Sequence, residues 1–129
     1  MLYLQSILDQ LAEPGNVNIS VPEFFNFGFD VVDTWAAEEN MTAFVSVNRT
    51  ATAIEYHSFA ELSHASNRFA NALQTLGAEK GECAIIILPR VPAWYEVVIG
   101  CIKAGVVAMP GTNLLTAKDI EYRINHSAA

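Results

Sequence analysis

With 129 residues, the chain is long enough for one domain built around a single hydrophobic core. Its formal net charge of -7, with only 7 Lys and Arg residues, argues against binding to nucleic acid or to an anionic membrane. Hydrophobic residues make up 52% of the chain and charged residues only 16%, which suggests apolar surface meant for a partner or for another part of the same chain.

The N-terminus and the cysteines indicate the compartment. Residues 1–12 lack the basic start and long apolar core of a signal peptide, and no apolar run reaches the ~18–20 residues that span a bilayer. Cys83 and Cys101 each lie among aliphatic residues, so we expect buried, reduced thiols. Together these features favour a cytoplasmic protein.

The first elements are a leading segment, 1–20, and a long helix. Ser20 and Glu23 have the spacing of a capping box, so the helix is expected to begin there and to end near Ala37. Four phenylalanines at its start are expected to be helix core rather than a ligand-facing patch: Phe24, Phe25, Phe27 and Phe29.

A β-hairpin and a second helix follow. Residues 43–47 and 53–56 are predicted as its two strands. Ser58 and Glu61 form a capping box that begins a helix, and Gly77 is placed to end it. The apolar stripe of this helix is expected to be Phe59, Leu62, Ser66, Phe69, Leu73 and Leu76.

The C-terminal part alternates strands and helices. Residues 82–88 are a continuous apolar run, typical of a strand covered on both faces in a parallel sheet. Pro89 ends that strand, and the next helix runs from Pro92 to Gly105. A second buried strand, 106–109, is expected to end at the pair Pro110–Gly111. Thr116 and Asp119 then cap a last helix, and the buried stripe of the middle helix is expected to be Trp94, Val97, Val98, Cys101 and Ile102.

This order predicts the α/β class, with a right-handed βαβ unit of a mostly parallel sheet, packing helices and a short β-hairpin. Two parallel strands do not form a stable sheet alone, so further strands must come from elsewhere. We therefore expect the chain by itself to self-associate or to be of low stability.

Candidate ligand-binding residues lie beyond the carboxyl ends of the two buried strands, where open α/β sheets bind ligands. Gly111 would let a ligand approach the backbone, and Thr112 and Asn113 would hydrogen-bond to it; the alternative is that the three form only a turn. Arg90 would hold a carboxylate or a phosphate, or else cap a helix or stay in solvent. The chain contains no phosphate-binding loop of either common glycine pattern.

Other polar residues favour no chemistry. His57, Glu61, His64 and Arg68 recur at near-helical spacing, which favours a solvated face over a metal site. Neither cysteine has a basic neighbour that would activate it. We therefore expect no catalytic residue, no metal site and no complete active site in this chain.

Five sequence blocks in a fixed order add a resemblance. They are residues 21–27 with 30–35, 58–62 with 67–73, 81–83 with 87–94, 105–112, and 119–124. This pattern, over 21–129, resembles the opening of medium-chain acyl-CoA synthetases and their acetyl-CoA-synthetase-like relatives, within the adenylate-forming superfamily. The resemblance implies that 21–129 is the first subdomain of a longer AMP-binding synthetase domain.

The resemblance also implies a reaction for a full-length enzyme, in which a carboxylate, ATP with Mg²⁺, and coenzyme A give a thioester. The phosphate loop and the adenylation lysine of the family come later and have no counterpart in this chain. It is expected to be an inactive scaffold that binds no cofactor alone and whose partner is the rest of the synthetase. In the family, the loop containing the equivalents of Gly111, Thr112 and Asn113 borders the channel for coenzyme A. Two alternatives remain, a stand-alone binding or interaction module and a fragment of another adenylating enzyme.

Overall fold

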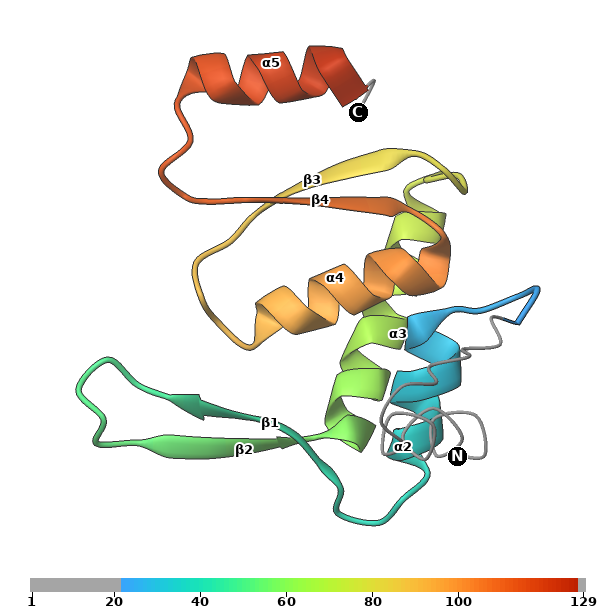
Figure 1. Ribbon diagram of the computed structural model, residues 1–129, viewed down its shortest axis with the longest axis vertical. Helices are drawn as coiled ribbons and strands as arrows, with labels where there is room; N and C mark the ends of the chain where they lie inside the picture. Colours follow the sequence, from blue (N-terminus) through green and yellow to red (C-terminus); the bar gives the residue numbers. More distant parts are fainter. Residues whose placement is uncertain (1–21, 128–129) are drawn as a thin grey trace, which may run out of the picture.

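The computed structural model describes residues 22–127, in which helices pack between a β-hairpin and a pair of parallel strands (Figure 1). The antiparallel hairpin consists of β1 (Thr42–Val47) and β2 (Ile54–Ser58). The parallel pair consists of β3 (Cys83–Ile87) and β4 (Val107–Gly111), connected through α4 (Ala93–Ala104). The α/β class, the βαβ unit and the hairpin are therefore confirmed.

The first helix differs from its prediction. Residues 22–26 are not helical, and a π-helix, η1 (Phe27–Asp33), continues into the short α2 (Thr34–Ala36). The predicted Ser20 cap and the leading segment 1–20 lie outside the described residues. The observed cap is Asn26, whose Oδ1 accepts from the Gly28 amide at 2.9 Å while its Nδ2 donates to the Ile102 carbonyl at 2.8 Å. A contact with α4 therefore decides where this helix begins.

The prediction that the four phenylalanines are helix core is wrong. Their exposed fractions are 83% for Phe24, 49% for Phe25, 44% for Phe27 and 50% for Phe29. Two of them precede η1, so the helical spacing that predicted a shared buried face does not apply to them. The buried residues of η1 are instead Gly28 and Val32.

Helix α3 (Phe59–Thr75) forms the centre of the fold and crosses α4 closely. Its capping box is confirmed, because the Glu61 carboxylate accepts from the Ser58 amide at 2.8 Å and the Ser58 hydroxyl accepts from the Glu61 amide at 3.2 Å. Gly77 and Gly105 follow α3 and α4 as predicted, and both are left-handed, with φ of 84° and 74°. Of the predicted stripe on α3, Leu62 and Ser66 are buried but Leu76 is 84% exposed.

The core has two parts. One joins Val32, Leu62 and Ile99, and so holds η1 against α3 and α4. The other joins Ile86, Cys101 and Val106, with Trp94 and Val97 partly buried against it, and so holds the parallel strands on α4. Of the predicted stripe on α4, Cys101 is buried and Trp94, Val97 and Val98 are partly buried against this core. The helix also buries Ile99, Gly100 and Lys103, which were not predicted, on the side that α3 covers.

The second parallel strand is longer than predicted. Pro110 and Gly111 do not end it but pair with Ile86 and Ile87. Pro110 has no backbone N–H to donate. A proline can still lie in a strand at the edge of a sheet, because there its nitrogen can face away from the neighbouring strand. Gly111 therefore lies in β4 rather than in the following loop, which begins at Thr112.

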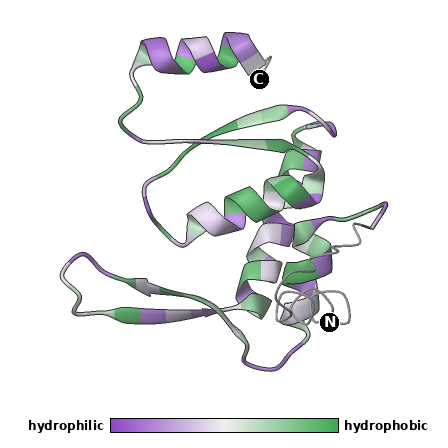
Figure 2. Ribbon diagram, in the orientation of Figure 1, coloured by the Kyte–Doolittle hydropathy of each residue, from purple (hydrophilic) through white to green (hydrophobic). Residues whose placement is uncertain are grey.

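The parallel strands are only partly covered. Ile87 is 37% exposed and Val107 is 48% exposed, so complete burial of both faces is not observed. In Figure 1, α4 and α5 (Ala117–Ser127) lie on opposite sides of the pair, but no residue of α5 is buried. Figure 2 shows hydrophobic residues concentrated on β3, β4 and α4, whereas α5 is mostly hydrophilic. The capping box of α5 is confirmed by the bond from the Thr116 amide to the Asp119 carboxylate at 2.9 Å.

Candidate ligand-binding pocket

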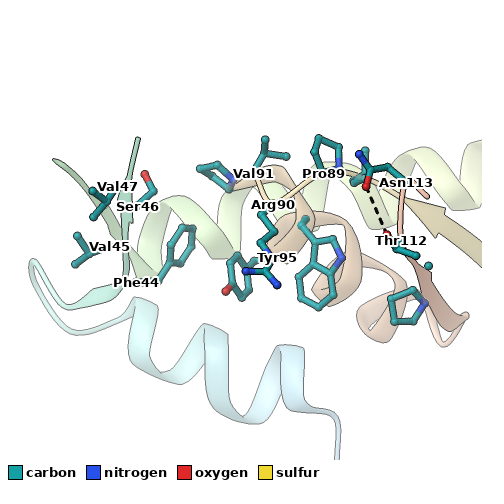
Figure 3. A pocket seen from close by; sticks show the side chains of 15 residues that line it. Phe44, Val45, Ser46, Val47, Pro89, Arg90, Val91, Tyr95, Thr112 and Asn113 are labelled. Atoms are coloured by element: carbon teal, nitrogen blue, oxygen red, sulfur yellow. Dashed lines mark hydrogen bonds between the residues drawn. The ribbon is translucent and has the colours of Figure 1, made fainter. Parts of the chain in front are cut away.

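A pocket of about 710 Å³ lies between strand β1 and the carboxyl ends of β3 and β4 (Figure 3). Strand β1 supplies Phe44 to Val47, and the segment after β3 supplies Leu88 to Pro92. The start of α4 and the end of β4 complete the lining, with Trp94, Tyr95 and residues 110–113. The pocket is therefore at the strand ends where the sequence predicted a ligand site.

Gly111, Thr112 and Asn113 all line this pocket. A Cβ atom at Gly111 would lie 2.6 Å from Leu115 Cδ1, so a side chain here would displace Leu115. The Thr112 hydroxyl donates to Asn113 Oδ1 at 3.5 Å and accepts from the Leu114 amide at 3.2 Å. These bonds are those of a turn, and they leave the side-chain amide nitrogen of Asn113 without a partner among residues 22–127.

Sequence reasoning did not predict the wall formed by the hairpin. The Phe44 ring stacks on His57 with 4.5 Å between centroids and lies 4.7 Å from Tyr95, which in turn lies 5.2 Å from Trp94. This row of rings joins the hairpin to the start of α4 along the pocket. Phe44 and Ser46 are two residues apart, a spacing that predicts one shared face of a strand but does not indicate that the strand lines a pocket.

His57 has a structural role in this wall. Its Nε2 atom lies 2.9 Å from the Ser46 hydroxyl and 3.9 Å from a Glu55 carboxylate oxygen. Glu61, His64 and Arg68 are exposed on α3, as predicted. Among residues 22–127, no three His, Cys, Asp or Glu side chains are grouped closely enough to hold a metal ion.

Both cysteines are free thiols, but only Cys101 is buried as predicted, and Cys83 is half-buried. Cys101 is completely buried, and burial raises the pKa of its thiol above the ordinary value. The thiolate required for nucleophilic attack is therefore disfavoured.

Sequence analysis also missed a buried polar cluster between the helices. Lys103, in the last turn of α4, donates to Asp33 Oδ1 at 2.5 Å and to Asn67 Oδ1 at 2.8 Å. The Ser63 hydroxyl donates to the same Asp33 oxygen at 2.6 Å. The Lys103 side chain is only 1% exposed, so this ion pair ties η1, α3 and α4 together inside the protein.

The chain is similar to proteins of a known enzyme family. The model of the AMP-binding enzyme family matches residues 32–129. Human acyl-coenzyme A synthetase ACSM3, mitochondrial, is 40% identical over 118 residues, which is 86% of this chain and 20% of that protein. Mouse acyl-coenzyme A synthetase ACSM1, mitochondrial, is 43% identical over 115 residues, which is 84% of this chain and 20% of that protein.

Solved structures agree with this result. A benzoate CoA ligase from Burkholderia xenovorans LB400 superposes with a TM-score of 0.63 at 28% identity, over 82% of this chain and 20% of that one. A fatty acid AMP ligase from Legionella pneumophila has a TM-score of 0.72 at 20% identity, over 82% of this chain and 19% of that one, and shows the fold alone. The fold is thus that of an N-terminal part of an adenylate-forming enzyme.

The chain belongs to the AMP-binding enzyme family, and the resemblance inferred from the five sequence blocks is confirmed. It spans about a fifth of the length of the curated relatives it matches. Within residues 22–127, no helix combines the length and the apolar character that crossing a membrane requires.

Proposed function

We propose that this chain is the opening framework of an AMP-forming acyl-CoA synthetase and is inactive alone. In the complete enzyme, a carboxylate would attack the α-phosphate of ATP, releasing pyrophosphate and forming an acyl-adenylate. The thiol of coenzyme A would then displace AMP to give a thioester. The observation that carries this proposal is the match over residues 32–129 to the AMP-binding family, with relatives named as acyl-coenzyme A synthetases at about 40% identity.

The uncovered surfaces of the chain support a framework role. We propose that residues 21–129 form one subdomain, preceded by the leading segment 1–20, and that the rest of a synthetase packs against it. The partly exposed strands β3 and β4, and helix α5 with no buried residue, are surfaces that such a partner would cover. Without that partner, we expect the chain to self-associate through these surfaces, which sedimentation at increasing protein concentration would reveal.

The residues of the pocket fit coenzyme A better than they fit ATP with Mg²⁺. No carboxylate lines the pocket, and Mg²⁺ in nucleotide sites is held by carboxylates together with phosphates. The lining is instead largely apolar and aromatic, with a few polar groups at the strand ends. We propose that Gly111, Thr112 and Asn113 border the channel for coenzyme A, with the small size of Gly111 leaving room for a narrow ligand.

Calorimetry tests the framework proposal directly. Titration of the purified 129-residue chain with ATP and Mg²⁺ is expected to give no binding heat, because the chain has no phosphate-binding loop. Thioester formation from a fatty acid, ATP and coenzyme A is expected to be absent as well. Tight binding of ATP, or product formation by the chain alone, would contradict the proposal.

The two alternatives predict different results. A stand-alone binding or interaction module would be a monodisperse monomer that unfolds cooperatively. A fragment of another adenylating enzyme would give a full-length product that does not acylate free coenzyme A. The free thiols of Cys83 and Cys101 support a reducing compartment. We propose that this compartment is the cytoplasm. The alternative is the mitochondrion, which the names of the relatives give as their location. Fractionation of cells would separate them.

A further inference from the structure

The pocket contains a single charged side chain. Of the 15 residues that line it, only Arg90 carries a charge, and it stands directly after strand β3. The whole chain has a net charge of -7, so a lone cation at the strand ends is a distinctive feature. A guanidinium group stays protonated at any physiological pH, and its planar donors suit phosphate and carboxylate oxygens.

Arg90 lies in a turn that is closed by backbone bonds between its neighbours. It lies between Pro89 and Pro92, and the turn is closed by bonds from the Val91 amide to the Pro89 carbonyl at 2.9 Å and from the Trp94 amide to the Val91 carbonyl at 3.0 Å. Among residues 22–127, its side chain has no hydrogen bond, ion pair or ring contact. In Figure 3 it points along the pocket in the direction of Tyr95. Of the two alternatives, the helix cap is not observed among residues 22–127, whereas the Arg90 side chain is exposed to solvent where it lines the pocket.

The rest of the pocket restricts what Arg90 would bind. The wall from β1 offers Val45 and Val47, both about half exposed, and the Phe44 ring. The side-chain amide of Asn113 supplies a neutral donor at the end of the neighbouring strand. A fitting ligand therefore has a negatively charged group at one place and a long neutral part elsewhere.

We propose that Arg90 binds a phosphate group of coenzyme A and thereby selects phosphorylated over unphosphorylated forms of the pantetheine arm. This inference rests on the proposed function, and it assigns a specificity residue to the same pocket. Coenzyme A has the required form, because its phosphates are attached to a long and uncharged pantetheine chain. ATP also carries phosphates, but the lack of a lining carboxylate leaves no ligand for its Mg²⁺. A charge-assisted contact of this kind weakens as salt is added.

The test is NMR titration of the 129-residue chain, following backbone amides of the pocket and the Nε–H signal of Arg90. The ligands are coenzyme A, pantetheine and ATP with Mg²⁺. Although the sequence predicts that the chain alone binds no cofactor, the pocket leads us to expect weak binding of coenzyme A, with Kd on the order of 1 mM, because only one side of the channel is present. Pantetheine should bind about tenfold more weakly, and only coenzyme A should shift the Arg90 signal.

Matched variants isolate the residue. Arg90→Gln is expected to remove the preference for coenzyme A over pantetheine, and Arg90→Lys to restore part of it. Arg68→Gln removes an exposed arginine on α3, outside the pocket, and should leave the preference unchanged. Unchanged circular dichroism of each variant would show that the fold is retained.

Three results would overturn the assignment. They are equal affinity for coenzyme A and pantetheine, a preference that survives Arg90→Gln, and no response to coenzyme A at concentrations on the order of 10 mM. If ATP shifts the Nε–H signal of Arg90 as much as coenzyme A does, the phosphate that Arg90 binds is that of the nucleotide, and the assignment to coenzyme A is wrong. None of these affects the framework proposal, which fails only if calorimetry finds tight ATP binding or the chain alone makes product.

Discussion

The buried ion pair between Lys103 and Asp33 gives the sharpest test of how the helices are held together. The two side chains are not equally buried, since Lys103 is 1% exposed and Asp33 is 32% exposed. Asp33→Asn keeps the shape of the side chain and its Oδ1 acceptor but leaves the buried ammonium without a counter-charge. Lys103→Met removes that charge and keeps an unbranched chain in the same space. The first change should therefore destabilise the protein more than the second.

The magnitudes follow from the environment of each group. Removing one partner of a buried ion pair costs about 3–5 kcal/mol, and we expect about 3 kcal/mol for Asp33→Asn because water reaches the carboxylate side. Lys103→Met should cost only about 1 kcal/mol, since Asp33 keeps the hydrogen bond from Ser63 and its contact with solvent. The double variant should be within about 1 kcal/mol of Lys103→Met, because no uncompensated charge then remains buried.

Urea unfolding followed by helical circular dichroism at pH 7 would measure these free energies. Glu121→Gln is a suitable control, because Glu121 is exposed on α5 and its replacement should change stability by less than about 0.5 kcal/mol. If Asp33→Asn costs no more than Lys103→Met, the uneven burial of the pair does not govern its energetics and the reasoning fails.

Three further changes test the packing and the caps. Gly100→Ala should cost about 1–3 kcal/mol in urea unfolding, since its Cβ would lie 2.9 Å from the Ser66 carbonyl oxygen and 2.8 Å from Phe69, and a neutral effect would mean that α3 and α4 separate easily. Trp94→Ala should cost about 2 kcal/mol, below the value for a fully buried ring, and a change under about 0.5 kcal/mol would place Trp94 outside the core. Hydrogen bonds from Ser58 lower the pKa of the Glu61 carboxyl below 4.5, so its contribution is present above pH 4.5 and is lost as the pH falls through the folded pKa. Glu61→Gln should therefore reduce the acid sensitivity of α3 in a circular dichroism titration, and an unchanged titration curve would contradict this role for the cap.

The candidate pocket was predictable in part. Two walls of the pocket lie where strands end, one at Arg90 and one at Gly111 to Asn113. The sequence indicated both walls, because continuous apolar runs stop at these positions. The wall from β1 was not predictable, because a hairpin contributes to a site only through its placement relative to α4. The contact between the Phe44 and Tyr95 rings joins residues far apart in the chain, and no local pattern specifies that distance.

Local interactions explain what the sequence alone determined. The capping boxes at Ser58 and Thr116, and the left-handed glycines after α3 and α4, depend on groups within a few residues of one another, so their patterns were sufficient. The family was likewise encoded in the order of short sequence blocks.

Tertiary structure decided the features that depend on distant groups. Helix η1 begins at Phe27 because Asn26 bonds to a carbonyl 76 positions away, and Lys103 is buried because Asp33, 70 positions away, supplies its counter-charge. The phenylalanines near η1 remain exposed because spacing can predict an apolar face but not whether another surface covers it. In each case the deciding free energy comes from a contact formed only after the chain has folded back on itself.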